Sequence, residues 1–284
     1  MALLPPFFLD TVVAIGIGDD PNNRHWVGTG FIYGDFAGKN DGGTSQYRTW
    51  LITNKHVLIG FHKIFVKFNS AQGSDSKDYD ISLIARNGRP RWIGHPDENI
   101  DVAAISINPK FLREEERRFS YFQSDNHTFT KPQMLAEEIT EGDGVFVLGF
   151  PMGWVSPERQ YVICRGGHIA RIRDFLENKA TDYLIDATIF PGNSGGPVII
   201  RPSATTIQGT KSVSKACLIG LIKAYMPYRD IAISQQTQKA RITFEENSGL
   251  AIVEPVDAII ETVKLAEKRI KSRAAYAKRK AKRM

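Results

Sequence analysis

The sequence of 284 residues contains no long hydrophobic run. Proline or charge interrupts every apolar stretch before it reaches the ~18 residues that would cross a bilayer. The apolar start, residues 1–9, contains Pro5 and Pro6 and has no basic segment before it, so it does not resemble a secretory signal. We therefore expect a cytoplasmic protein without a transmembrane segment.

Cysteine is scarce as well, with only Cys164 and Cys217. Neither lies at a spacing typical of metal-ligating motifs, and we expect both to be free and buried. The histidines His62 and His95 also lack cysteine or carboxylate neighbours at ligand spacing. The sequence thus predicts no metal site, and no cofactor is expected.

The net charge of +6 is unevenly distributed. The tail 264–284 holds ten Lys or Arg against Glu267 alone, a net charge of +9, which leaves −3 for residues 1–263. Such a tail could be a solvated helix end, or it could bind an acidic protein, an anionic surface or a nucleic acid. Nucleic acid is the least favoured partner, because Tyr276 is the one aromatic residue available for base stacking.

Short runs rich in β-branched and aromatic residues, separated by turn residues, dominate the chain and predict an all-β fold. Six of them form a first unit, residues 1–110, and the strand-like runs there are roughly 10–17, 26–33, 48–54, 63–68, 80–85 and 101–107. Residues 111–140 are interpreted as the linker between the units, and the pieces 111–118 and 134–139 within it as short helices or linker. A second unit, residues 141–254, follows, with runs at 145–150, 160–165, 167–172, 183–188, 197–201, 215–222 and 248–253.

Two polar segments in the second unit, 202–214 and 226–247, show little periodicity and are interpreted as long surface loops. After them, Pro255 is suited to the first turn of a helix, and apolar residues recur at helical spacing as far as Ile270. We expect residues 255–284 to form a docked C-terminal helix and a basic tail that is solvated or frayed from residue 271.

A glycine-rich turn stands out in the second unit. Ser194 lies between Gly192-Asn193 and Gly195-Gly196, where glycines permit backbone angles and close approaches that a Cβ would prevent. Such a turn can present one hydroxyl beside free backbone N–H groups, which suits a nucleophile next to an oxyanion site. The motif taken alone is also compatible with an ordinary turn.

A serine nucleophile needs a base and a group that orients the base. His56 directly follows a strand-like run, and Asp101 begins an apolar strand, where an isolated charge would be costly without a partner. No histidine follows Ser194, which excludes the Ser-acid-His order of α/β-hydrolases, and the subtilisin order would need its aspartate before His56. The order His, Asp, Ser remains.

Five motifs in this order resemble the trypsin/chymotrypsin-like serine peptidases, most closely the bacterial HtrA/Deg branch. They are Gly28-Thr29-Gly30-Phe31-Ile32, Thr53-Asn54-Lys55-His56-Val57, Asp101-Val102-Ala103-Ala104-Ile105, the segment 142–151, and the segment 186–197 around the serine. The resemblance implies two six-stranded antiparallel β-barrels with the catalytic triad His56, Asp101 and Ser194 between them. It also implies an oxyanion hole made by the N–H groups of Gly192 and Ser194.

Departures from the family shape the expected function. Asn193 stands where zymogen-activated relatives have aspartate, so activation by N-terminal cleavage is not expected, and a basic helix stands in place of the PDZ domain typical of the HtrA branch. The resemblance places Thr188 at the floor of the first substrate pocket, which disfavours cleavage after Lys or Arg. The strand with Leu221, Ile222 and Lys223 would edge that pocket and pair with the backbone of the substrate.

The sequence therefore predicts a serine endopeptidase that hydrolyses protein or peptide substrates through an acyl-enzyme, after small or aliphatic P1 residues. Without a zymogen step, we expect regulation by a partner or by loop ordering. The alternative is a catalytically silent protease-fold module that binds extended peptides or serves as a scaffold.

Overall fold

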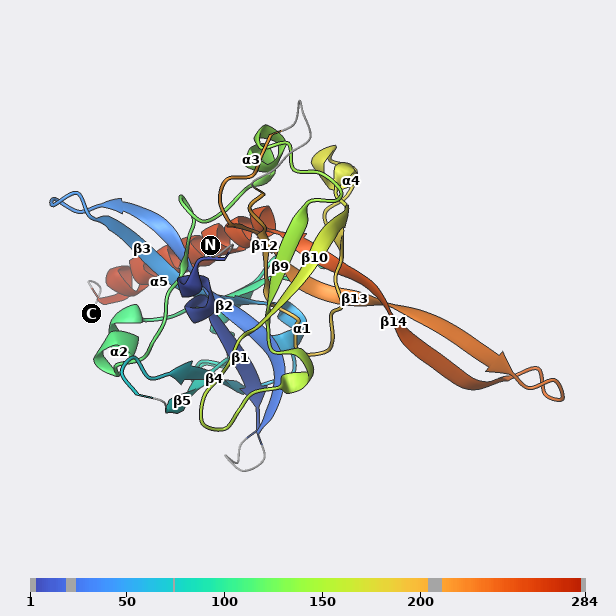
Figure 1. The fold of residues 1–284 in the computed structure, drawn as a ribbon. Coiled ribbons are helices and arrows are strands. Elements are labelled where there is room, and N and C mark those ends of the chain that lie inside the picture. The colour runs from blue at the N-terminus through green and yellow to red at the C-terminus, as the bar shows by residue number, and fades with distance from the viewer. Residues whose placement is uncertain (1–3, 19–23, 74, 204–210, 282–284) are drawn as a thin grey trace.

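The computed structural model describes residues 4–18, 24–73, 75–203 and 211–281. Its first unit is an eight-stranded sheet that curls into a half-barrel (Figure 1). Seven strands pair antiparallel in the order β5-β4-β1-β2-β3-β7-β6, and β8 is added beside β2 in parallel. The strands are β1 (Val12–Ile17), β2 (His25–Lys39), β3 (Ser45–Thr53), β4 (Lys63–Asn69), β5 (Ser76–Ser82), β6 (Trp92–Gly94), β7 (Ala103–Ser106) and β8 (Phe122–Gln123). Over the described residues this sheet does not close, whereas the sequence predicted a six-stranded barrel.

The second unit is a closed barrel in the order β10-β11-β14-β13-β12-β9. Its strands are β9 (Gly144–Gly149), β10 (Ile163–Arg171), β11 (Tyr183–Asp186), β12 (Pro197–Ile200), β13 (Cys217–Ile233) and β14 (Ala240–Pro255). A half-barrel sheet, a closed six-stranded barrel and a C-terminal helix agree with the predicted double-barrel architecture, and that prediction is confirmed.

Two predictions about the second unit are wrong. The runs 160–165 and 167–172 belong to one strand, β10, because Gly166 and Gly167 continue its pairing with β9. Residues 226–247 are not a surface loop, since they form the outer part of a long hairpin between β13 and β14. Of the other predicted loop, 202–214, the segment 204–210 lies outside the described residues.

Short helices connect the strands. They are η1 (Pro6–Thr11), α1 (Lys55–Leu58), α2 (Pro109–Glu114), α3 (Lys131–Ala136), η3 (Pro151–Gly153) and α4 (Arg173–Leu176). The region 111–140 therefore has the two helical pieces that the sequence predicts. It also contributes β8 to the first sheet, and Thr128 forms a parallel bridge with Leu218 of the barrel. This segment thus contacts both units.

The C-terminal helix α5 (Val256–Ala281) docks on both units. Its buried residues Val256, Ile259 and Val263 belong to the main hydrophobic core. On the first unit, Glu261 forms a hydrogen bond with His95, and Glu267 forms an ion pair with Arg48. The backbone stays helical to Ala281, and Lys271 and Ser272 are exposed, so over the described part the tail that was expected to be solvated or frayed begins as a solvated helix. Among the described helices, none is long and apolar enough to cross a membrane.

The two cysteines are free, but they differ in exposure. Cys217 is buried on β13, and burial raises the pKa of its thiol to about 11. Cys164 on β10 is exposed. The expectation of a buried pair is therefore wrong for Cys164, whose strand turns this side chain to the outer surface of the barrel.

Candidate active site

His56 and Asp101 meet at the ends of two neighbouring strands. β3 ends at Thr53 and leads into the short helix α1 that carries His56, and Asp101 lies just before β7, the partner of β3. His56 Nδ1 lies 2.5 Å from Asp101 Oδ2, and the backbone N–H of His56 donates to Asp101 Oδ1 at 3.1 Å. Two contacts to one carboxylate fix both the position and the orientation of the imidazole.

The carboxylate of Asp101 is held in its ionised form. Burial by itself would raise the pKa of Asp101, but the hydrogen bonds and the charge of His56 lower that pKa below its ordinary value. An anionic Asp101 keeps a proton on Nδ1 of His56 and leaves Nε2 free to accept one. This is the tautomer that a general base requires.

Groups from both units hold the backbone of Asp101. The Asn54 side chain donates to the Asp101 carbonyl at 2.7 Å from the first unit. From the second unit, the carboxylate of Glu254 accepts the Asp101 N–H at 2.8 Å through Oε1. Asp101 is therefore positioned by contacts on both sides of the interface between the two units.

Glu254 belongs to a small buried ion network. Its side chain is fully buried, and Lys223 Nζ lies 3.0 Å from Oε1. Burial raises the pKa of Glu254, although the Asp101 N–H and Lys223 oppose that rise. Lys223 also contacts Asp182 and donates to the carbonyl of Asn99 at 2.6 Å. The network thus joins β13 and β14 to the segment that carries Asp101.

The glycine-rich turn has the backbone geometry that its sequence predicts. Gly192 and Gly195 have φ values of +96° and +82°, in the left-handed region. A Cβ on Gly192 would lie 2.3 Å from the carbonyl oxygen of Phe150, and one on Gly195 would lie 2.1 Å from that of Thr29. Only glycine fits either position, because both the backbone angle and the space exclude a side chain.

Thr29, from the first unit, holds this turn in place. Its hydroxyl donates to the Gly192 carbonyl at 2.6 Å and accepts the N–H of Phe150 at 3.1 Å. Its own N–H donates to the carbonyl of Ser194 at 2.8 Å. The fully buried Thr29 thus connects the second barrel to β2 through three hydrogen bonds around the serine.

Asn193 stabilises the nucleophile turn through hydrogen bonds inside the turn itself. It is almost fully buried, its side-chain oxygen accepts the N–H of Phe190 at 3.2 Å, and its own N–H donates to the Phe190 carbonyl at 3.0 Å. These local bonds hold the turn with a neutral side chain.

The turn presents free backbone donors. The Pro191 carbonyl accepts the N–H of Met152 at 2.6 Å. In a trans peptide the following N–H points in the opposite direction, so the N–H of Gly192 is directed away from the Met152 segment. Among the described residues, no hydrogen bond uses the N–H of Gly192 or of Ser194. Both are available to an oxyanion.

Ser194 and His56 face one cavity of about 530 Å³, which Asp101 also lines. No hydrogen bond joins the Ser194 hydroxyl to His56 within the described part of the chain. Such catalytic hydrogen bonds are often long until a substrate closes the site, so this geometry is compatible with a serine-histidine pair. No group of three potential metal ligands occurs among the described residues.

A sequence-family description of a trypsin-like peptidase domain matches residues 28–201, more than half of the chain. The chain belongs to this family. No curated protein matches the chain. The matched range of this trypsin-like peptidase includes His56, Asp101 and Ser194 and ends before β13.

The residues predicted to bind substrate separate into two groups in this trypsin-like peptidase. Lys223 lines the cavity that contains Ser194, although its ammonium group is engaged by Glu254, Asp182 and Asn99. Leu221 and Ile222 are fully buried in β13 and are not among the residues that line the cavity. Thr188 is exposed, accepts a bond from Arg165 through its carbonyl and also does not line it.

Other lining residues were not identified from the sequence. They are Ile189, Phe190 and Pro191 before the nucleophile turn, and Ala224, Tyr225, Pro227, Arg229 and Glu245 from the β13–β14 hairpin. The first three lie within the motif segment 186–197, and Pro227, Arg229 and Glu245 lie in the segment 226–247 that had been interpreted as a loop. The lone acid Glu254 in the apolar run before Pro255 was a detectable indication, since a buried charge needs a partner.

Proposed function

We propose that this trypsin-like peptidase is an active serine endopeptidase that works through an acyl-enzyme. Ser194 attacks the peptide carbonyl, His56 takes its proton and returns it to the leaving amine, and Asp101 holds the imidazole. The N–H groups of Gly192 and Ser194 stabilise the oxyanion. The observation that carries this proposal is the pairing of His56 with Asp101 in the cavity that contains Ser194, beside two unused backbone donors.

The cavity supports a preference for small or aliphatic P1 side chains. Its apolar lining consists of Ile189, Phe190, Pro191, Ala224 and Pro227, and burial of apolar surface against these residues favours an apolar side chain. Apart from Asp101, which pairs with His56, the charged residues that line it are Lys223, Arg229 and Glu245, and these are engaged in ion pairs with residues of this chain. These three side chains therefore do not provide a free charge that would select a charged P1 residue.

The test is cleavage of a random peptide library by the wild-type protein and by Ser194→Ala, with the new termini identified by mass spectrometry. We expect cleavage after Ala, Val and similar residues by the wild type, and a loss of kcat on the order of 10⁶ in the variant. Dominant cleavage after acidic or basic residues would refute the P1 preference. Equal cleavage by both proteins would refute the role of Ser194.

Membership of the HtrA/Deg branch, regulation by a partner or a loop, a cytoplasmic location and a role for the basic tail in binding acidic partners remain predictions from the sequence. The catalytically silent module is the other outcome of the same experiment, in which neither protein cleaves any peptide.

A further inference from the structure

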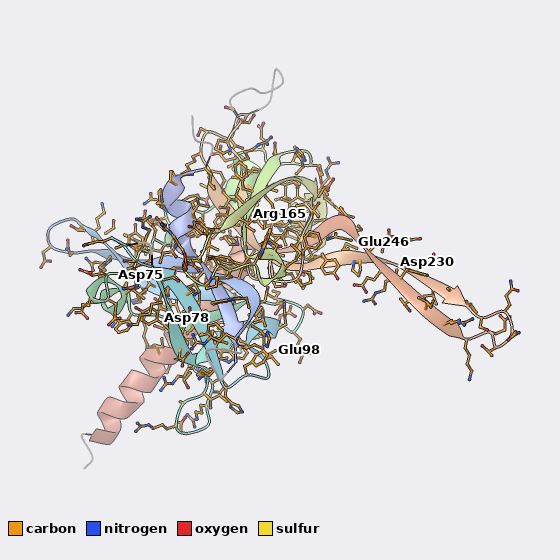
Figure 2. All side chains as sticks on the ribbon, turned by 60° about the horizontal axis from the view of Figure 1, so that its bottom comes forward. Asp75, Asp78, Glu98, Arg165, Asp230 and Glu246 are labelled. Atoms are coloured by element: carbon orange, nitrogen blue, oxygen red, sulfur yellow. The ribbon has the colours of Figure 1, made fainter. Side chains whose placement is uncertain are left out.

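The outer half of the β13–β14 hairpin leaves the barrel and projects into solvent (Figure 1). β13 pairs with β12 only as far as Leu221, and β14 pairs with β11 only from Leu250 to Val253. Further out, from the pair Pro227–Asn247 to the pair Ile233–Ala240, the two strands pair with each other. Figure 2 places Asp230 and Glu246 on this projecting ribbon, away from the body of the protein.

This ribbon exposes an unusual number of large apolar side chains. Tyr228, Ile231, Ile233, Ile242 and Phe244 are each between 51% and 60% exposed. A two-stranded ribbon is marginally stable in water, and grouped exposed apolar residues mark binding surfaces. The composition of the ribbon therefore indicates that another chain covers part of it.

The base of the ribbon is part of the proposed active site. Tyr225, Pro227, Arg229 and Glu245 line the same cavity as Ser194. Side chains two residues apart along a strand share a face, so Ile231 and Ile233 continue the face on which Pro227 and Arg229 border the cavity. This face thus begins at the proposed catalytic centre and extends to the end of β13, and it is apolar at Pro227, Ile231 and Ile233 but carries the Arg229–Glu245 ion pair between them.

The edge of β13 points to an extended chain as the occupant. The Gly195 N–H donates to the carbonyl of Ile222 at 2.9 Å, and the Ile222 N–H donates to that of Gly196, so β13 passes directly beside the nucleophile turn. From Lys223 outward, this edge has no strand partner within the described residues. A free edge can accept an added strand, and an antiparallel one would carry its N-terminal part along β13 toward the tip.

Backbone pairing along this edge has a limit. Pro227 has no N–H, so it cannot donate to an added strand. At Pro227 an added strand must therefore be held by side-chain contacts, and Ile231 and Ile233 expose apolar side chains further along β13.

The balanced charge of the hairpin indicates which kind of polypeptide segment would bind it. Residues 226–247 contain three basic residues, Arg229, Lys239 and Arg241, and three acidic ones, Asp230, Glu245 and Glu246. Arg229 is paired with Glu245 at 2.9 Å, and Glu245 also accepts a bond from Tyr225. A neutral, apolar surface favours an apolar partner over a strongly charged one.

We propose that the β13–β14 hairpin is an exosite for the substrate, which binds an extended, apolar polypeptide segment on the N-terminal side of the scissile bond. This inference rests on the proposed peptidase function and specifies its substrates. The exosite spans the part of the chain from the cavity to Ile233, about ten residues at ~3.3 Å each. It selects unfolded or locally extended protein segments, because a folded chain cannot lie along the ribbon.

The test compares two double variants on opposite faces of the ribbon. Ile231→Asn/Ile233→Asn alters the face that continues from the cavity, and Ile242→Asn/Phe244→Asn alters the other face as a matched control. The probe is a fluorescein-labelled peptide with an alanine at P1 and about ten apolar-rich residues before it. A second probe carries the same residues after the scissile bond. Binding is measured by anisotropy in the Ser194→Ala background, and cleavage is measured with the active protein.

We expect the first double variant to weaken binding of the N-terminally extended probe about tenfold or more, as loss of apolar burial implies. The KM of this double variant for the N-terminally extended probe should rise by a similar factor. Binding of the C-terminally extended probe, hydrolysis of a short peptide that spans only the cavity, and the thermal midpoint should stay unchanged. Equal effects on both probes, equal effects of both double variants, or no effect would overturn the exosite.

Two further outcomes separate the possibilities. A protein that binds the extended probe through Ile231 and Ile233 but cleaves no peptide would refute the proposed function and leave the docking surface standing. A dimer in sedimentation velocity that the first double variant dissociates, with peptide binding unaltered, would overturn the exosite in favour of a second copy of the chain.

Discussion

The buried carboxylate of Glu254 accepts the backbone N–H of Asp101 at 2.8 Å, so a residue of the second barrel positions the proposed triad acid of the first. Lys223 pairs with the same carboxylate oxygen and holds the carbonyl of Asn99. The alignment of His56 therefore depends on a contact between the two units as well as on the end of its own strand.

Substitution of Glu254 should separate charge from hydrogen bonding. Glu254→Gln keeps an acceptor for the Asp101 N–H, whereas Glu254→Ala removes it and leaves Lys223 without this partner. We expect Glu254→Ala to lower kcat/KM about tenfold and to destabilise the protein by about 3 kcal/mol, because one member of a buried pair is lost. Glu254→Gln should restore most of kcat. Peptide hydrolysis and urea unfolding measure both effects, and an equal loss of kcat in both variants would contradict a positioning role for the acceptor.

Thr29 offers a test of how the nucleophile turn is held. Thr29→Val keeps the shape but removes the hydroxyl that bonds Gly192 and Phe150, and Thr29→Ser keeps the hydroxyl. We expect Thr29→Val to cost about 1–3 kcal/mol of stability, because two buried backbone groups lose a partner. It should also reduce kcat more than it changes KM, since the Gly192 N–H shifts. Thr29→Ser should resemble the wild type, and a Thr29→Val protein with unchanged kcat would disprove this support.

Asn193 should not tolerate a negative charge. The side chain is almost fully buried, and its Nδ2 has no hydrogen-bond partner in the described structure. Asn193→Asp would place a carboxylate in the same space, where the contacts of Asn193 within the described residues are to backbone groups of Phe190 and Gly196, and such a buried charge is costly. We expect a fall of the thermal midpoint and of activity that is larger at neutral pH than in mild acid, where protonation restores a neutral side chain. A variant as stable as the wild type at neutral pH would contradict this account.

Glu141 gives the fold a pH-dependent contribution. Its Oε1 accepts the N–H groups of Ile172 and Arg173 at 3.0 Å each, and mainly the bond from Ile172 lowers the pKa of Glu141 to about 2. A carboxyl group with a lowered folded-state pKa stabilises the protein above its ordinary value of 4.5, and this contribution disappears as the pH falls toward 2.

The matched variant is Glu141→Gln, compared with the wild type in urea unfolding at neutral and at acid pH. We expect a loss of no more than about 1 kcal/mol at neutral pH, because solvent screens a partly exposed carboxylate. The difference should shrink as the pH falls below 4.5. A difference that stays constant with pH would show that the charge of Glu141 does not contribute.

Much of the proposed site was accessible from the sequence because it rests on local features. Strand ends placed His56 and Asp101, and the glycines around Ser194 indicated a turn that needs left-handed backbone angles. The two-barrel order followed from the motifs. These features depend on short segments that can be recognised from their own residues, without knowledge of what packs against them.

The remainder depends on pairing between distant segments. Ile242 and Phe244 do alternate with polar neighbours, and Ile231 and Ile233 flank Ala232, but the charged residues nearby and the absence of an Asn-Gly or Asp-Gly turn concealed the strands. Glu254 meets Asp101 only once β14 lies beside the first unit. The partners of Lys223, which are Glu254, Asp182 and Asn99, likewise could not be predicted from its place in a strand, because they come from other segments.

The most direct test of the central claim is covalent labelling by a fluorophosphonate probe, which reacts with activated serines. The account predicts that the wild type is labelled at Ser194, located by tandem mass spectrometry, and that Ser194→Ala and His56→Ala are not labelled. Absence of labelling in the wild type, labelling at another residue, or equal labelling of His56→Ala would contradict the claim that His56 and Asp101 activate Ser194.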